Sequence, residues 1–259
     1  MNKKVSGAKS VVVKLESKGK NYLPFVEYLK DRYIKYIDVV LVGSLPYSTD
    51  ACITDTDGLF LTLANKSGNS FFVHDETLNR YDLLQNLGLR RPVGQKLSLQ
   101  NSYITVTDDA YVGKSVLLVF WYDLPEYSAR NMTDAQLTDN FEVKIDSNYS
   151  NNLLPDNRTM VSKRFRKIAL ALPTYTPTFS QSVTYSDIQH LYITLQKGNY
   201  KIFDAIPLAE LYEIGNIEIL DFANIVFDFT YSYIWVGGKG TRINVAGKSV
   251  FFNAVYEDK

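Results

Sequence analysis

Few residues in this sequence have the chemistry that catalysis or metal binding requires. The chain contains one cysteine, Cys52, and two histidines, His74 and His190. A cysteine beside a histidine can act as a nucleophile, but Cys52 lies far from both histidines along the chain. A buried structural thiol and two ordinary polar histidines are therefore the simpler interpretation. No C-x-x-C or H-x-x-x-H spacing indicates a transition-metal site.

Two glycine-containing motifs resemble binding loops, and each lacks a required part. DTDG (Asp55–Gly58) has two acids beside a glycine, as calcium loops do, but lacks the remaining EF-hand spacing, so it predicts a turn into a strand starting at Leu59. VGGKGTR (Val236–Arg242) lacks the Walker A spacing and indicates a bend. No G-x-S-x-G occurs, and nothing selects a catalytic pair among 28 acidic residues. The sequence therefore predicts no enzyme activity, no cofactor and no metal.

The densest charge cluster is SKRFRK, whose basic residues flank an aromatic ring. On a strand, Lys163 and Lys167 share a face with Phe165. The arginines, Arg164 and Arg166, lie on the other face. Three interpretations stay open: a charged edge strand, a salt-bridged contact with an acidic neighbour, and a less favoured nucleic-acid contact.

Several sequence blocks that predict strands occur twice in the chain. LFLTL (residues 59–63) and LYITL (residues 191–195) share three letters, and each is followed by a turn with Gly-Asn. Flanking blocks recur in the same order, although β-rich sequences also resemble one another by chance. The paired blocks are residues 39–46 with 167–173, residues 97–106 with 217–227, and the Trp-containing strands 116–122 with 231–236. This order predicts a domain-sized duplication.

Composition favours strands. Of 259 residues, 46% are hydrophobic, and 19 tyrosines and 14 phenylalanines lie largely in runs rich in Val, Ile and Thr. We predict a mainly β fold with two related antiparallel β-sandwich (jelly-roll-like) domains from an internal duplication and a few short helices. A single large jelly roll is the alternative. Helices are expected within Leu23–Val40, in part of His74–Gly88 and at Ile206–Gly215.

The predicted organisation has five parts. These are a basic N-terminal arm and helix (1–38), a first β-sandwich (39–128), a linker (129–157), a second β-sandwich (158–238) and a C-terminal hairpin arm (239–259). Both arms are expected to contact neighbouring subunits, because adding a strand satisfies the edges of a sandwich. Removing residues 1–20 and 239–259 is then expected to leave a folded monomer that does not assemble.

The candidate interface residues combine the basic segments with a tyrosine pair. They are Lys3, Lys4, Lys9, Lys163, Arg164, Arg166, Lys167, Tyr231 and Tyr233. Alternation would place Trp235 on the face of Tyr231 and Tyr233, which makes that face aromatic and therefore core or interface.

The formal net charge is zero, so bulk electrostatics favours no partner class. No stretch reaches the roughly 18 apolar residues of a membrane span, and the N-terminus lacks the apolar core of a secretory signal. With a single cysteine, these features predict a cytoplasm-like compartment and no membrane contact.

The paired LFLTL and LYITL blocks, the tyrosine-rich IVFDFTYSYIWV, the basic arm and the lack of active-site signatures resemble virion structural proteins of crAss-like tailed bacteriophages. Portal-to-tail ring proteins and auxiliary capsid proteins are the members it resembles. The resemblance implies a non-enzymatic subunit of a ring or shell, localised in the virion and assembled in the host cytoplasm. Its implied partners are further copies of itself and portal, capsid or tail subunits. A carbohydrate- or peptide-binding β-sandwich module is the alternative.

Overall fold

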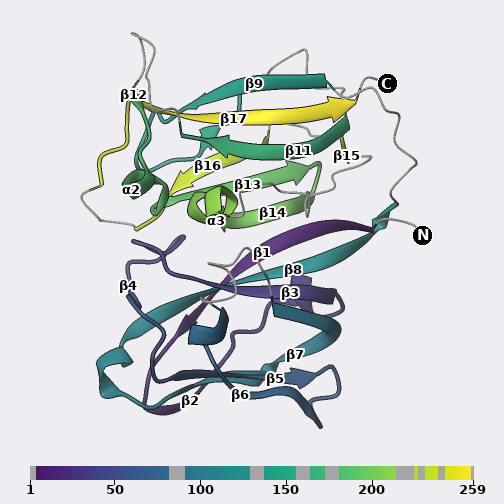
Figure 1. The fold of residues 1–259 in the computed structure, drawn as a ribbon, viewed down its shortest axis with the longest axis vertical. Coiled ribbons are helices and arrows are strands. Elements are labelled where there is room, and N and C mark those ends of the chain that lie inside the picture. The colour runs from purple at the N-terminus through teal and green to yellow at the C-terminus, as the bar shows by residue number, and fades with distance from the viewer. Residues whose placement is uncertain are drawn as a thin grey trace. The chain divides into compact units, whose positions relative to one another are not determined.

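The structure, a computed structural model, describes residues 4–81, 91–128, 137–155, 164–172, 181–213, 225–226, 231–238 and 243–257. The chain divides into two compact units, a first unit of residues 9–123 and a second unit of residues 1–8 and 124–259. Both consist mainly of strands (Figure 1), which confirms the predicted mainly β fold with a few short helices.

The first unit contains eight strands. They are β1 (Lys4–Lys14), β2 (Gly19–Tyr22), β3 (Tyr33–Val40), β4 (Ala51–Cys52), β5 (Leu59–Asn65), β6 (Phe71–Thr77), β7 (Arg91–Val106) and β8 (Lys114–Ser128). Two 3-10 turns, η1 (Glu27–Leu29) and η2 (Asp109–Tyr111), lie between them. The early residues of β1 and the last residues of β8 belong to the second unit.

These strands pair in the order of a jelly roll. One sheet has the order β1-β8-β3-β7, and the other has β2-β7-β5-β6. The long strand β7 belongs to both, because Arg91–Lys96 pairs with β3 and Leu97–Val106 pairs with β5. Strand β4 adds to β8 in parallel. Apolar side chains from both sheets form the core, including Val13, Leu61, Ile104, Leu118 and Phe120.

The second unit repeats this pairing. Its strands are β9 (Leu137–Lys144), β10 (Asn152–Leu153), β11 (Arg164–Ala171), β12 (Gln181–Ser182), β13 (Leu191–Lys197), β14 (Tyr200–Pro207), β15 (Ile225–Val226), β16 (Tyr233–Val236) and β17 (Lys248–Glu257). The helices are α2 (Tyr185–Ile188) and α3 (Leu208–Glu213). One sheet contains β9-β17-β11-β15, the other contains β10-β16-β13-β14, and β12 adds to β17 in parallel. The orders match strand for strand, so the second unit is also a jelly roll.

The repeat holds at the level of single residues. Leu59 pairs with Val106 in the first unit, and the equivalent Leu191 pairs with Val236 in the second. The register of β3 on β8 shifts after Ile34, and that of β11 on β17 shifts after Phe165. The blocks that begin at Leu59 and Leu191 are therefore equivalent strands, as the sequence predicted.

The hairpins β5–β6 and β13–β14 share an irregular feature. The hydroxyl of Thr62 accepts a hydrogen bond from the Asp75 amide at 3.1 Å, and the Thr194 hydroxyl accepts one from Ala205 at 3.1 Å. Asp75 and Ala205 both have positive φ angles, of 46° and 55°. A threonine thus satisfies the amide that each β-bulge turns out of the ladder.

Two buried asparagines fix equivalent turns. Asn21 Oδ1 accepts hydrogen bonds from the amides of Glu16 and Ser17. Asn152 Oδ1 accepts them from Asp146 and Ser147 at the same place in the second unit. The side-chain amide of each asparagine donates to carbonyls of its own loop.

The expected helix at Leu23–Val40 is wrong. This segment contains only the short turn η1, followed by strand β3. Tyr33, Tyr36 and Ile37 recur at helix-like spacing because the bulge between Ile34 and Tyr36 interrupts the alternation of the strand.

The other two helix predictions have different outcomes. The segment His74–Gly88 begins as β6, its residues 79–81 are helical as expected, and the part from residue 82 onward lies outside the described residues. The helix expected at Ile206–Gly215 is confirmed as α3.

Part of the predicted alignment between the copies is also wrong. The strand that contains Trp121 is β8, whose equivalent is β17 rather than the Trp235 strand β16. Likewise, Tyr103–Val106 of β7 matches β16. In the first unit one strand, β7, belongs to both sheets, whereas in the second unit two separate strands, β15 and β16, take its place. An alignment that assumes the same spacing of strands in both copies therefore pairs the wrong strands.

Two segments that were predicted to lie outside the sandwiches are built into them. Residues 137–153, within the predicted linker, form β9 and β10. The predicted C-terminal hairpin arm contains β17, which lies between β9 and β11 in its sheet. In the N-terminal arm, Val11, Val13 and Leu15 are buried. Cross-strand partners far away in sequence stabilise these polar or basic segments, and local composition does not reveal such partners.

Candidate interaction surfaces

The residues with catalytic potential are distributed over the two units. Half-buried Cys52 lies in β4, and burial raises the pKa of its thiol to about 11, which keeps it protonated near neutral pH. His74 is exposed on β6, whereas His190 precedes β13 in the second unit. Among the described residues, no group of three or more His, Cys, Asp or Glu is placed to hold a metal ion. In the same part of the chain, no helix is both long enough and apolar enough to cross a membrane.

DTDG forms the predicted turn into β5. Gly58 has a φ of +72°, and the Leu59 amide donates to the Thr56 carbonyl. Asp55 accepts a hydrogen bond from the Tyr111 hydroxyl, which lowers the pKa of Asp55. Burial and this contact raise the pKa of Tyr111 to about 12. The contact joins the loop to η2 and is structural.

The predicted basic interface residues lie in strands or outside the described residues. Lys4 and Lys9 lie in β1, whereas Lys3 and Lys163 are not described. The remaining residues Arg164, Arg166 and Lys167 lie in β11. Because β11 pairs with β17 on one side and β15 on the other, this segment is not an edge strand. The bulge after Phe165 also breaks the alternation assumed for SKRFRK.

The tyrosine pair occupies a partly exposed position. Tyr231 precedes β16 and is 55% exposed. Within β16, Tyr233 and Trp235 are half-buried, whereas Ile234 and Val236 are buried. The aromatic residues therefore lie on the side of β16 opposite the core. Burial of this face by a neighbouring subunit stays a prediction.

A second aromatic surface lies on the first unit, and we call it the aromatic platform: Lys20, Tyr22, Phe71, His74 and Tyr103. Tyr103 is only 4% exposed, and its ring meets those of Tyr22 and Phe71 edge-on, at centroid distances of 5.6 and 6.1 Å. Tyr22 and Phe71 are 58% and 45% exposed. The Lys20 ammonium lies 4.5 Å from the Tyr103 ring centroid, and His74 meets Phe71 edge-on at 5.7 Å. Two exposed rings thus rest on a buried third ring.

The equivalent surface of the second unit is different. Leu153 takes the place of Tyr22, and Lys201 takes the place of Phe71. Lys201 forms an ion pair of 2.9 Å with Asp204. The platform therefore belongs to the first unit alone. Its residues are separated in sequence, and only an alignment of the correct strands could have identified them.

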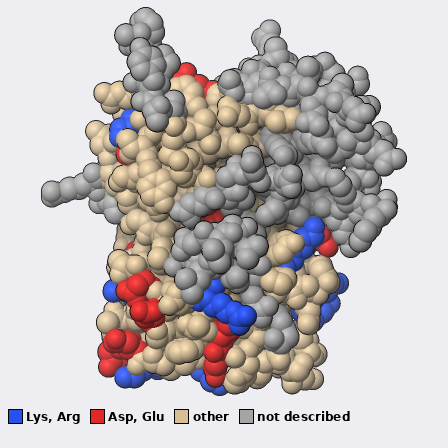
Figure 2. Space-filling model, viewed as in Figure 1, with Lys and Arg blue, Asp and Glu red and all other residues tan. Residues whose placement is uncertain are grey.

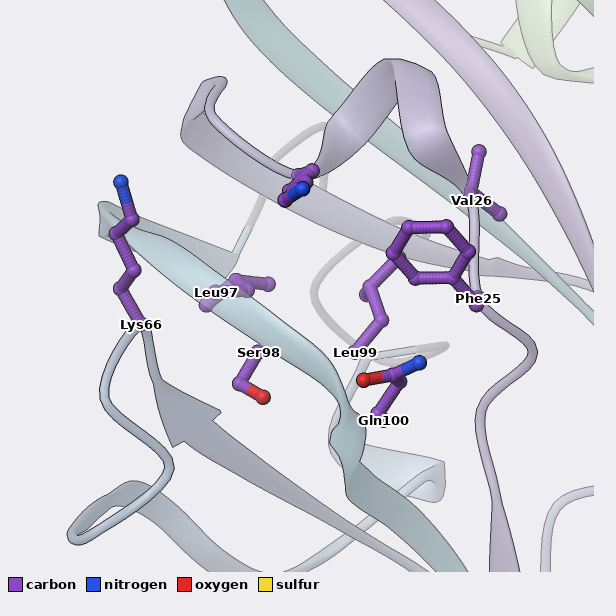
Figure 3. A pocket seen from close by; sticks show the side chains of 8 residues that line it. Phe25, Val26, Lys66, Leu97, Ser98, Leu99 and Gln100 are labelled. Atoms are coloured by element: carbon purple, nitrogen blue, oxygen red, sulfur yellow. The ribbon is translucent and has the colours of Figure 1, made fainter.

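A small pocket opens beside the segment after β2 in the first unit. Its volume is about 170 Å³, and it is lined by Phe25, Val26, Lys30, Lys66 and residues 97–100 of β7. Figure 3 shows Phe25 beside Leu99, with Lys66 at the other end. Lys66 is paired with Asp31 at 2.5 Å. Pockets for small molecules are usually larger, at roughly 300–1,000 Å³, so this one is small for a ligand site.

Charge is mixed on the visible surface. In Figure 2, the described acidic and basic side chains on the face shown lie close to one another rather than in patches of one sign. This pattern agrees with a formal net charge of zero. The described residues on this face form no extended basic surface for a polyanion such as nucleic acid.

Comparison with known proteins adds little. No protein-family model and no curated protein matches the chain. Among solved structures, the chain is similar to the major capsid protein P2 of bacteriophage PM2, with a TM-score of 0.26 and 12% sequence identity over 96% of each chain. A likeness at this level carries no argument about function.

Proposed function

We propose that the chain is a non-enzymatic structural subunit of a virus particle, assembled in the host cytoplasm and acting through contacts between subunits. The observation that carries the proposal is the pair of jelly rolls with matching registers, which together account for nearly all described strands. Jelly rolls recur in viral capsid shells and also in lectins. Because a fold alone does not fix function, the surfaces must support the choice.

The exposed aromatic side chains support an assembly role. Large aromatic side chains are exposed on both units, including Tyr22, Phe71, Tyr149, Tyr200 and Tyr231. Tyrosine and phenylalanine are enriched where protein surfaces meet. In addition, the half-buried Cys52 has a raised pKa, which makes a catalytic thiolate unfavourable.

Within the virion class, the tandem jelly rolls favour a shell subunit over a portal-to-tail ring protein, because the jelly roll is a recurring fold of shells. The test is the sedimentation mass of the purified full chain over a range of concentrations. We expect discrete species of many subunits, each of 29.5 kDa. A single 29.5 kDa species at every concentration would contradict the proposal.

A second candidate function is carbohydrate binding at the aromatic platform. Exposed rings beside a lysine and a histidine combine apolar faces with polar groups, as binding surfaces for small ligands do. Screening the purified chain and its Phe71→Ala variant against oligosaccharides tests this function. Binding that is lost in the variant supports it, and no binding by the unaltered chain excludes it.

A further inference from the structure

The second unit contains a strand junction at the edge of β14. The sheet β10-β16-β13-β14 continues into β1, whose residues 4–8 belong to this unit. The last strand of this sheet, β14, therefore pairs with β1. This junction uses the outer edge of β14 and the edge of β1 that faces away from β8.

The repeat assigns an equivalent to each partner of this junction. Strand β6 corresponds to β14, because β5–β6 and β13–β14 share the same bulged hairpin. Strand β9 corresponds to β1, because each leads into the same turn. The amides of Leu15 and Ile145 donate to the carbonyls of Lys114 and Lys248, both at 2.9 Å.

Neither equivalent edge has a strand partner among the described residues. The sheet of the first unit ends at β6, and β9 pairs with β17 alone. Strand β6 (FFVHDET) contains no lysine or proline, and β9 (LTDNFEVK) contains only Lys144 at its end. Exposed edges are commonly protected by lysine, proline, a β-bulge or a covering element. Strand β6 has a bulge at Asp75, but β14 has the equivalent bulge at Ala205 and still pairs with β1, so the bulge does not prevent strand addition.

The hydrogen-bond pattern shows which amides such a contact would use. The Ile145 amide points to β17, so every second residue of β9 does so, and the Asn140 amide points away. The Leu78 amide donates to Leu59 of β5, so the neighbouring Thr77 amide points away from β5. Thr77 and Asn140 each present a donor at an edge without a strand partner in the described chain.

We propose that β6 of one copy pairs with β9 of a second copy, in a junction equivalent to that between β14 and β1. The inference rests on the proposed function and deepens it by naming the partner and the two edges. The contact joins different surfaces of the two copies, so it is head-to-tail and generates a ring or an open chain. Because both strands contain acidic residues, main-chain hydrogen bonds rather than ion pairs hold the contact together.

Two proline variants test this junction. Thr77→Pro and Asn140→Pro each remove one outward amide donor, and proline is tolerated where an edge amide faces solvent. Thr77→Val and Asn140→Ala are the matched controls, because they keep the amide. Thermal unfolding establishes that each variant is folded, and sedimentation gives its mass.

We expect the controls to assemble like the unaltered chain and each proline variant to remain at 29.5 kDa. An equimolar mixture of the two proline variants should give a species of twice that mass, because each variant retains the edge that the other lacks. Assembly of a folded proline variant at the level of its control would overturn the junction and leave the proposed function standing. If one variant does not fold, the other decides. Absence of assembly by the unaltered chain would overturn both proposals.

Discussion

Threonine and asparagine side chains at equivalent positions preserve the irregular backbone of both units. Thr62 and Thr194 bind the amides of bulged residues with positive φ. Surface residues at equivalent positions have diverged, since Phe71 of the platform is matched by Lys201. Hydrogen bonds to the buried backbone are shared by the two copies, whereas surface chemistry is specific to each.

Replacing Thr194 by valine should destabilise the protein by about 1–3 kcal/mol, the cost of leaving a buried amide without its acceptor. Thr194 is buried, and valine has nearly the same shape. Thr194→Ser keeps the hydroxyl and is the control, with a smaller loss. Urea unfolding measures the stability of both variants. Equal losses of stability would mean that side-chain packing, rather than the hydrogen bond, determines the effect.

His190 should make stability depend on pH. Burial lowers the pKa of the half-buried His190 from its ordinary value of 6.5, although Asp187 opposes this shift. The unfolded chain therefore binds the proton first as pH falls, so the contribution of His190 is complete above pH 6.5 and decreases below it.

Unfolding free energies at about pH 7.5 and pH 5.5 test the role of His190, because carboxylates titrate mostly below this range. Between these two pH values, the unfolding free energy should decrease more in the unaltered chain than in the His190→Gln variant. An identical decrease in both proteins would show that other groups cause the pH dependence.

Among the elements, the turns held by Asn21 and Asn152 should contribute similar amounts to the free energy of unfolding. Each asparagine bridges a loop through hydrogen bonds to two amides and two carbonyls of that loop. Asn21→Ala and Asn152→Ala should each cost about 2–4 kcal/mol, since several part-buried hydrogen bonds are lost together. Thermal and urea unfolding measure the losses, and the exposed Asn151→Ala is the control, within about 0.5 kcal/mol. A large loss in only one of the two turns would contradict their equivalence.

Several elements could be predicted from sequence because their patterns are local. The strands at residues 59–63 and 191–195 have apolar runs bounded by turn residues, and the DTDG turn has its glycine where φ is positive. Strand β3 could not be distinguished from a helix, since its bulge imitates helical spacing. Strand β9 lies in a polar stretch and forms because β17 pairs with it from more than a hundred residues away.

The aromatic platform was also beyond the reach of local patterns. Tyr22, Phe71 and Tyr103 come from β2, β6 and β7, which lie together only because of the jelly-roll order. The predicted tyrosine pair was identifiable because Tyr231 and Tyr233 are two residues apart. Sequence reasoning therefore identifies sites within one strand and misses those that several strands assemble.

At the scale of the whole molecule, the terminal segments are structural. Deleting residues 239–259 removes β17, which pairs with β9, β11 and β12. We expect the second unit to lose its fold rather than to yield the assembly-deficient monomer expected from sequence. Far-UV circular dichroism and limited proteolysis measure this loss, with deletion of residues 258 and 259 as the control. A truncated protein that unfolds cooperatively with the stability of the control would contradict this assignment.

On the proposed function, two jelly rolls in one chain form the subunit of a symmetric particle. Electron microscopy of assemblies of the purified full chain tests it most directly, because it shows both the symmetry and the internal repeat of the subunit. We expect closed rings or shells in which each subunit contains two jelly rolls. Monomers alone, or aggregates without symmetry, under every condition that keeps the chain folded would contradict it.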